Sequence, residues 1–587
     1  MSAPAPPVDA ATDAPRPRAH RRRGDAIALI LLLGVALGTW VPRLRGPIDL
    51  RWDASVYYIL GTSLYEGSGY RLLNEPGQVR AVQYPPGLPA IAAAAQWVSG
   101  SSDPAVAGRW LRAFNLACYA AYLLAVYALS RRYFGPAVSV GVSLVAGLHH
   151  QTLFLSDLLF AELPFTVCAL AVILLNRNGG RPVGFAAQTA LGWAAFMLRS
   201  AGLALLAAWV GDAVFRRQWR LAAARAATAA IPVLAWQAYV GHVTASDEYV
   251  RPAYEYQRAA YQFYNVPYAA NMKLVDPFAP ELGEVTPGGW VRRLTGNVPE
   301  MISGIGQAVL TDQGALNVMI RKALELAGIA PPTALIRGTL VAATWALGLA
   351  AVLGTAVLLA RREWLLGLFV VAAAVLVATT PWPMQYTRYL TPTIPMLVIA
   401  VAYAIAWVTG MACGRRSPAA DGATGRAATG AVAVVLSALL LVNLVVAARL
   451  YRPVVGGLIG RAADAGEVGR LFYYFPEWQM YDLACDWIAA NAVPDAVVVT
   501  ATPQWAYVRS GRRAVMTPMI KDPVEALRLV DGVPVTYAID DQMNIGTVVS
   551  RYLRPAIAHD PDGWRTAYVA PDGKTRVVQR VRPPAGG

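Results

Sequence analysis

The sequence predicts a mainly α-helical, polytopic membrane protein that carries a small α/β domain at its C-terminal end. Of its 587 residues, 56% are hydrophobic and only 15% are charged, and the mean hydropathy is +0.40. Soluble globular chains rarely show such values. Apolar runs long enough to cross about 30 Å of hydrocarbon recur through the first three quarters of the chain. After Leu450 the composition changes, which indicates a separate domain.

Eleven of the apolar runs are expected to be transmembrane helices. The two runs that flank Arg199 are short, so the number of spans there stays open. The runs cover residues 26–42, 107–130, 137–153, 157–175, 184–198, 200–215, 222–240, 334–359, 364–380, 389–409 and 428–447.

Basic residues in the short loops set the orientation, because cytoplasmic loops retain positive charge during membrane insertion. The basic clusters fall on every second connection, which places the N-terminus inside and segments 43–106, 241–333 and 448–587 outside the cytoplasmic membrane. This pattern explains much of the net charge of +15, so nucleic-acid binding is not needed to account for it. The clusters are Arg21 to Arg23, Arg131 with Arg132, Arg177 with Arg181, Arg216 with Arg217 and Arg220, Arg361 with Arg362, and Arg415 with Arg416.

The chain therefore divides into three parts. Residues 1–24, rich in Pro and Ala and then basic, are expected to form a disordered cytoplasmic tail. No cleavable signal peptide is expected, because the first apolar run is long and lacks a small-residue cleavage site. Residues 25–447 form the membrane body with its two long outer loops, 43–106 and 241–333.

Residues 448–587 are expected to form the extracytoplasmic α/β domain. A helical stretch, YDLACDWIAANAV, precedes the apolar run AVVVTA, and a second helical stretch, DPVEALRLVDG, precedes VPVTYAID. Strands and helices that alternate over short turns are typical of a partly parallel sheet.

Asp53 is the most informative residue of the first outer loop. The stretch DASVYYILGTSLYEG carries apolar residues at helical spacing, which predicts a helix along the membrane surface with Asp53 at its N-cap or in its first turn. Asp53 could merely cap this helix. A carboxylate held at the outer surface would also suit chemistry on a lipid-borne substrate.

Several motifs, taken in order, support the chemical interpretation. D-x3-Y from Asp53, then GSGY and QYPPGLP, is followed by SDLLFAELPF at 156–165, QYTRYLTPTIPML at 385–397 and the terminal TPQWAYVRSGRR. This series resembles the GT-C superfamily of glycosyltransferases. Within it, the chain is similar to the family-39-like branch, which includes protein O-mannosyltransferases and aminoarabinose transferases.

The resemblance implies an inverting glycosyltransferase of the cell envelope. Such enzymes move a sugar from a polyprenyl-phosphate donor to a hydroxyl acceptor outside the cytoplasmic membrane, and the acceptor can be a glycan, a lipid or a protein. It implies that Asp53 is the catalytic base and that Asp157, at a second acidic position, is the other candidate catalytic residue. Membrane lipids are the other expected partner.

A departing phosphate needs cations or hydrogen-bond donors near the outer surface. Arg388, in QYTRYL, and Arg199 are the candidates, because the positive-inside rule disfavours arginine at both positions. Either guanidinium could instead extend to lipid phosphates or pair with a carboxylate. Tyr84 could donate a further hydrogen bond to the phosphate.

Asp157 is expected to open the fourth helix, where it could position the acceptor, neutralise Arg199 or act as an ordinary N-terminal helix carboxylate. Glu162 would lie about 140° further around that helix, so the two acids should not share a face. Glu162, Gln83 and Tyr58 are the candidate substrate-binding residues. His149 and His150 could bind a metal but are more typical of interfacial polar residues.

Metal dependence is left open by the motif before the Pro-Pro pair. The aminoarabinose branch has Glu-Lys there, whereas this chain has Gln83 and Tyr84. Gln is a poor zinc ligand and Tyr carries no positive charge at neutral pH, which disfavours a divalent metal at this position.

The second outer loop contains six tyrosines within twenty residues. They fit an aromatic belt at the membrane interface, or a lid that stacks on a sugar. They are Tyr249, Tyr254, Tyr256, Tyr261, Tyr264 and Tyr268.

A lipid or glycan transporter, or a polymerase-like membrane protein, is the alternative function. A transporter should place its charges near the bilayer midplane, in paired repeats with broken helices. The candidate charges of this chain cluster at the outer surface instead. An inactive scaffold that only presents the α/β domain is disfavoured by Asp53.

Overall fold

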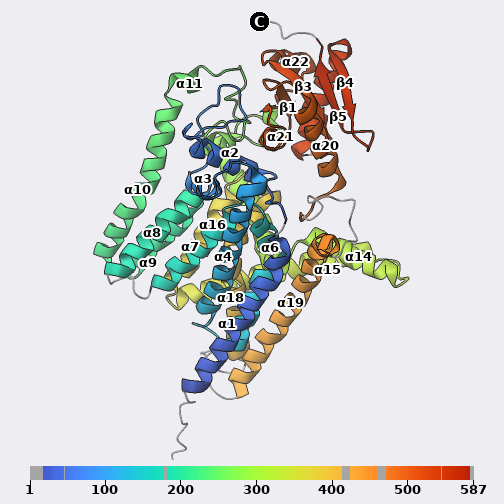
Figure 1. Cartoon of the computed structure of the whole chain (residues 1–587). Coiled ribbons are helices and arrows are strands. Elements are labelled where there is room, and N and C mark those ends of the chain that lie inside the picture. The colour runs from blue at the N-terminus through green and yellow to red at the C-terminus, as the bar shows by residue number, and fades with distance from the viewer. Residues whose placement is uncertain are drawn as a thin grey trace, which may run out of the picture.

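The computed structural model describes residues 18–44, 46–176, 182–412, 423–458, 471–543 and 545–581. Most of the predicted tail lies outside these ranges, as do the basic residues at 177, 181, 415 and 416. The described chain forms a long helical bundle with a small sheet domain above one end (Figure 1). The mainly α fold with a C-terminal α/β domain is thus confirmed.

The predicted apolar runs are mostly helical, although the run 137–153 breaks at His149 and the run 157–175 is non-helical at 158–161. Among the described residues, five helical spans are long and apolar enough to cross a membrane, or six if the pair bent by 53° after Leu148 is one span. The number eleven stays a prediction. The helices are α1 (Arg18–Trp40), α4 (Pro104–Ser130), α5 (Pro136–Leu148), α6 (His150–Asp157), α7 (Glu162–Leu175), α8 (Pro182–Leu198), α9 (Gly202–Phe215), α10 (Trp219–Thr244), α15 (Thr333–Ala360), α16 (Trp364–Ala378), α18 (Ile394–Ala412) and α19 (Ala423–Leu458).

The two long segments that are predicted to lie outside the membrane, 43–106 and 241–333, contain helices of their own. The first holds α2 (Asp53–Tyr65) and α3 (Gly87–Ser99), which lie at the end of the bundle nearest the sheet (Figure 1). The second, predicted as a loop, holds α11 (Asp247–Val250), α12 (Tyr268–Lys273), α13 (Pro287–Leu310) and α14 (Gln313–Leu326).

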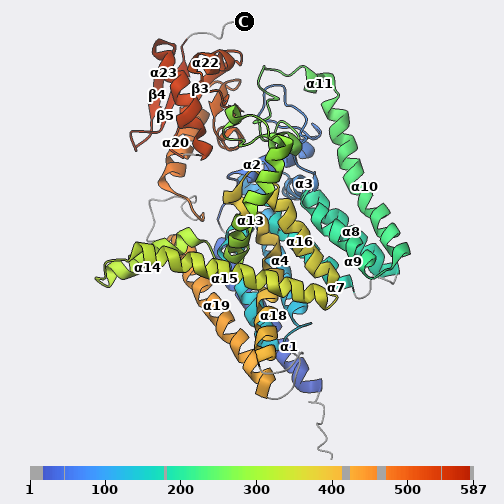
Figure 2. The same ribbon diagram turned by 180° about the vertical axis from the view of Figure 1, so that it is seen from behind.

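Helix α13 is a departure from the predicted loop. It packs against α15 inside the bundle, whereas α14 projects sideways as an arm (Figure 2). Met301, Ile305 and Val309 recur at four-residue spacing and are buried. Arginine and glutamate on the opposite face lower the mean hydropathy of this helix, which explains why an apolar-run criterion missed it.

The C-terminal domain is built on a five-stranded sheet in the order β2-β1-β3-β5-β4. β1 (Val497–Thr500) pairs in parallel with β2 (Arg513–Met516) and β3 (Val535–Asp540), whereas β5 (Arg576–Arg580) is antiparallel to β3 and to β4 (Trp564–Val569). Helix α20 (Pro476–Asn491) precedes β1, and α21 (Pro503–Ser510) and α22 (Pro523–Asp531) connect the parallel strands. The predicted partly parallel sheet is thereby confirmed.

One apolar core continues from the segment 43–106 into this domain. Leu50, Ala54 and Leu88 belong to the same buried cluster as Trp478 and Val498. The domain therefore packs on the segment that carries Asp53.

Glycines allow helix α15 to approach its neighbours closely. A side chain at Gly348 would overlap the carbonyl oxygen of Ile302 in α13, and one at Gly354 would overlap that of Ala400 in α18. Small residues at such crossings are the usual means by which membrane helices pack backbone to backbone.

We expect Gly354→Ala to destabilise the bundle by about 1–3 kcal/mol, because the added methyl group must displace the α18 backbone. Gly338→Ala on the same helix meets open space and should leave stability unchanged or slightly raised. Thermal unfolding of both purified variants in detergent measures the difference. Equal melting temperatures would contradict the close crossing.

Candidate active site

Asp53 and Arg388 lie in direct contact, although they are 335 residues apart in the chain. Asp53 is the first residue of α2, and Arg388 lies in the short helix α17 (Tyr386–Leu390) that leads into α18. Arg388 Nη2 donates to Asp53 Oδ2, and the ring of Phe160 lies 4.4 Å from the guanidinium carbon. Both side chains are partly accessible, at 16% for Asp53 and 21% for Arg388, so a ligand can reach them.

Glu162 extends this contact to a second arginine. Arg388 Nε donates to Glu162 Oε1 at 3.1 Å, and Arg199 Nη1 contacts the same oxygen at 2.6 Å. Glu162 opens α7, and Arg199 lies in the turn between α8 and α9. Four helix ends thus bring Asp53, Arg388, Glu162 and Arg199 into one chain of ion pairs. We call it the site ion-pair chain.

The site ion-pair chain contains two carboxylates and two guanidinium groups, so its formal charge is zero. Burial raises the pKa of Asp53, but the charge of Arg388 and the hydrogen bonds from Arg388 and Tyr264 outweigh burial and hold it below its usual range. The carboxylate of Asp53 is therefore ionised at neutral pH.

Tyrosines surround the carboxylate of Asp53. Tyr264 Oη donates to Asp53 Oδ1 at 2.6 Å, which places one tyrosine of the second outer segment over the site. Tyr84 lies between Tyr57 and Tyr264, with ring centroids 4.8 and 6.0 Å away. Burial, and then the charge of Asp53, raises the pKa of both Tyr84 and Tyr57, so both phenols remain protonated donors.

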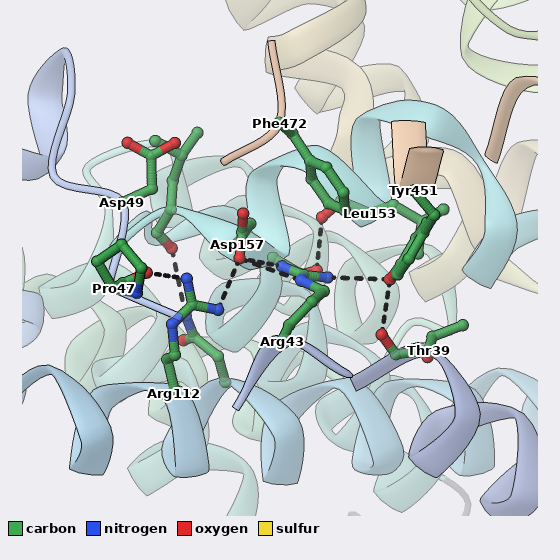
Figure 3. A network of polar contacts seen from close by, with 12 residues as sticks. Thr39, Arg43, Pro47, Asp49, Arg112, Leu153, Asp157, Tyr451 and Phe472 are labelled. Carbon is green, nitrogen blue, oxygen red and sulfur yellow. Dashed lines mark hydrogen bonds and ion pairs between the residues drawn. The ribbon is translucent and has the colours of Figure 1, made fainter. Parts of the chain in front are cut away.

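Asp157 lies in a separate buried network (Figure 3). Its Oδ1 atom contacts Arg43 Nη2 at 2.5 Å and Arg112 Nη1 at 3.0 Å, and all three side chains are at most 2% exposed. Arg43 also donates to Tyr451 in α19 at 3.3 Å, and Arg112 donates to the carbonyl oxygen of Pro47. The network joins the end of α1 to α4, α6 and α19.

Two predictions about Asp157 are wrong. It ends α6 instead of opening the next helix, because the chain leaves the helix at 158–161 and forms a parallel bridge between Leu158 and Asp49. It also does not neutralise Arg199, since Glu162 does so. Asp157 and Glu162 therefore lie on different helices, so the predicted angle of about 140° between them around a single helix does not apply.

Two other candidates point elsewhere. The hydroxyl of Tyr58 donates to the carbonyl oxygen of Ser102 at 2.8 Å, whereas Tyr57 lies near enough to Asp53 and Glu162 for burial and then their charges to raise its pKa. Gln83 is buried and donates to Asn271 at 3.1 Å. A substrate-binding role for Tyr58 or Gln83 stays a prediction.

The histidine pair is used in contacts between helices. His149 Nε2 lies 3.1 Å from the carbonyl oxygen of Gln307, and His150 Nδ1 lies 3.0 Å from Thr311 Oγ1. Within the described ranges, no group of three or more His, Cys, Asp and Glu side chains could hold a metal ion.

Comparison with solved structures shows the fold. The archaeal oligosaccharyltransferase AglB from Archaeoglobus fulgidus, in complex with an inhibitory peptide and a dolichol-phosphate, is similar over 95% of this chain and 74% of that chain, with 12% identity and a TM-score of 0.50. AglB tethered to an acceptor peptide matches over the same shares, with 11% identity and a TM-score of 0.50. ArnT from Cupriavidus metallidurans, bound to undecaprenyl phosphate, covers 95% of this chain and 99% of its own, with 13% identity and a TM-score of 0.46. No family model and no curated protein matches the sequence. The likeness to AglB confirms the GT-C fold that the motifs predict.

We expect Asp157→Asn to destabilise the protein by about 3–5 kcal/mol, because it leaves Arg43 and Arg112 buried without a counter-charge. Asp53→Asn should cost much less, since Arg388 keeps its contact with Glu162. The two variants are compared by thermal unfolding in detergent, which is monitored as the loss of the monodisperse peak in size-exclusion chromatography after heating. An Asp157→Asn protein as stable as the wild type would contradict a structural role for this network.

Proposed function

We propose that this protein transfers a sugar from a polyprenyl-phosphate donor to a hydroxyl acceptor at the outer face of the cytoplasmic membrane, with inversion at the anomeric carbon. The observation that carries the proposal is the contact between Asp53 and Arg388, continued through Glu162 to Arg199. It places one candidate base beside two candidate phosphate-binding cations. In this assignment the N-terminus is cytoplasmic and the C-terminal domain is outside.

An apolar groove supports a lipid donor. It lies between α9 and α10 and is lined only by apolar residues, among them Leu203, Leu206 and Val210 of α9 and Ala226, Ala229 and Val233 of α10. Leu203 lies at the start of α9, just after the turn that carries Arg199. A polyprenyl chain in this groove would bring its phosphate to the level of Arg199.

The donor phosphate would compete with the carboxylates for the arginines. One guanidinium group can donate to two phosphate oxygens at once. Such charge-assisted hydrogen bonds are roughly twice as strong as hydrogen bonds between neutral groups. When Arg388 turns to the phosphate, Asp53 loses its counter-charge while it remains buried. Its pKa then rises, and Asp53 becomes a stronger base at the moment when the donor is in place.

The transfer itself is a single displacement. Asp53 takes the proton of the acceptor hydroxyl as its oxygen forms the bond to the anomeric carbon, and the bond from that carbon to the phosphate oxygen breaks. Acceptor and phosphate stand on opposite faces of the sugar, which inverts the anomeric configuration. The charge that develops on the leaving polyprenyl phosphate is stabilised by Arg388 and Arg199, and Tyr84, whose ring packs beside that of Tyr264, is a further candidate donor.

Tyr264 gives the second outer segment a role in access. Its hydroxyl occupies one oxygen of Asp53, which the acceptor hydroxyl must reach. The acceptor would therefore displace Tyr264 or share the carboxylate with it.

The function is tested with the purified full chain in lipid nanodiscs and a panel of polyprenyl phosphates that carry radiolabelled sugars. We expect label to pass from at least one donor to a hydroxyl acceptor, with inverted configuration in the product. A protein that moves the intact labelled lipid between leaflets, and transfers no sugar from any donor, would be a transporter and would overturn the proposal.

We expect Asp53→Asn to lower the turnover number by about 10²- to 10⁴-fold, because asparagine keeps the size of the side chain but cannot take a proton. Folding should be preserved. Single-turnover assays with saturating donor measure the loss. Near-normal turnover in this variant would refute the assignment of Asp53 as the base.

We expect Arg388→Gln to lower kcat by about 10²-fold, the usual cost of removing one donor to a developing oxyanion. It should also move the acid limb of kcat/KM to higher pH, because burial raises the pKa of Asp53 once Arg388 no longer lowers it. Arg388→Lys should leave the limb near its wild-type position but recover only part of the rate, since an ammonium group lacks the guanidinium fork. Unaltered pH profiles in both variants would show that Arg388 does not act on Asp53.

A further inference from the structure

The residue before Asp53 has a backbone conformation that side chains rarely adopt. Trp52 has φ 55° and ψ −133° and is not a glycine. Such conformations cost about 1–3 kcal/mol and persist only where the surroundings enforce them. Because Trp52 leads directly into α2, its backbone sets the direction in which the Asp53 side chain leaves the chain.

The Trp52 ring is held from two sides. Phe154 of α6 packs edge-on with ring centroids 5.6 Å apart, and Trp478 of α20 does so at 5.3 Å. The guanidinium carbon of Arg51 lies 4.6 Å from the same ring. Each aromatic pair contributes about 0.5–1.5 kcal/mol beyond its buried area, so the two pairs together match the cost of the backbone conformation.

Arg51 ties the same point to the chain that enters the C-terminal domain. Its fully buried guanidinium pairs with Asp49 at 2.6 Å, and it donates to the carbonyl oxygen of Tyr473 at 2.9 Å and to that of Phe472. These carbonyl groups lie three and four residues before α20 begins. The guanidinium of Arg51 has five N–H donors, enough to bind both oxygens of the carboxylate and two carbonyl groups at once, whereas an ammonium group has only three.

We propose that the C-terminal α/β domain is a working part of the active site, and that Trp478 is the positioning residue through which it holds Trp52 and aims Asp53 at Arg388. The inference deepens the proposed function and rests on it. In the alternative, Trp478 only anchors the domain to the bundle. Loss of its ring would then lower stability and leave the chemistry of Asp53 unaltered.

Trp487 provides a matched control on the same helix. Its ring stacks on Tyr568 at 5.9 Å and packs edge-on against Tyr537 on the sheet side of the domain. Trp487→Ala therefore removes an equal aromatic volume from α20 without touching Trp52.

The experiment compares Trp478→Ala with Trp487→Ala in the full chain. For Trp478→Ala we expect kcat per folded molecule to fall by about 10²-fold, the scale of a 1 Å misplacement at a reacting group. The KM for the donor should not rise, because a loosened Asp53 competes less for Arg388, and the acid limb of kcat/KM should move to higher pH as the contact between Asp53 and Arg388 loosens. Trp487→Ala should keep the wild-type kcat and pH limb. If both variants keep them, the inference fails.

A second readout needs no turnover. Carbodiimide-driven coupling of an amine to Asp53, measured by peptide mass spectrometry relative to the exposed Asp103, reports how firmly Arg388 covers the carboxylate. We expect faster coupling in Trp478→Ala and wild-type coupling in Trp487→Ala. Trp478→Leu, which keeps apolar bulk but no ring, replaces Trp478→Ala if the smaller side chain prevents folding.

The two proposals fail in different ways. If the wild type transfers no sugar while Trp478→Ala still increases coupling at Asp53, the proposed function is wrong and the positioning by Trp478 stands. If the wild type is active but coupling and kcat are unchanged in a folded Trp478 variant, the function stands and the domain only anchors.

Discussion

The pairing of Arg388 with both Asp53 and Glu162 is the contact on which the rest of the site depends. An uncompensated charge at the edge of the hydrocarbon region is costly, so each guanidinium group must keep a partner whether or not a ligand is bound. Asp53 and Glu162 supply those partners and leave the site neutral. A phosphate that enters can then exchange for the carboxylate of Asp53, so that Arg388 keeps an anionic partner throughout. The same exchange gives Asp53 two states, a weak base that is paired and a stronger base that is not.

Two acids that stand close together in the sequence serve two separate networks because the chain breaks between them. Asp157 ends α6 and pairs with Arg43 and Arg112, whereas Glu162 opens α7 and joins Arg388. The intervening residues bridge to Asp49, three residues before Trp52. The Asp157 network therefore fixes the strand-like junction from which both Glu162 and Asp53 are presented. Rigid support of this kind is what a site needs if its polar groups are to be held in place before the substrate arrives.

The apolar runs, the separate C-terminal domain and the motif positions of Asp53, Arg388 and Glu162 could be predicted, because periodicity and local motifs carry that information. Which acid meets which arginine could not, since the partners are separated by hundreds of residues. The helix that carries Tyr57 and Tyr58 is buried on nearly all sides, so its apolar pattern does not show which of the two tyrosines lies near Asp53. The break before Glu162 did leave a signal: Pro164 is tolerated in the first turn of a helix and not in its interior. The contact of Tyr264 with Asp53 had no sequence signature beyond the tyrosine-rich composition.

Competition between Asp53 and phosphate for Arg388 is the central claim, and equilibrium binding of a bare polyprenyl phosphate tests it most directly. The wild type and Asp53→Asn are compared in nanodiscs at neutral pH, with Arg388→Gln as the reference for a lost arginine. If phosphate must displace Asp53, the Asp53→Asn protein binds the lipid more tightly than the wild type. Each 1.4 kcal/mol that displacing Asp53 costs the wild type corresponds to a Kd about tenfold lower in the variant. Arg388→Gln binds it more weakly than either. Equal or weaker binding by Asp53→Asn would contradict the exchange at Arg388.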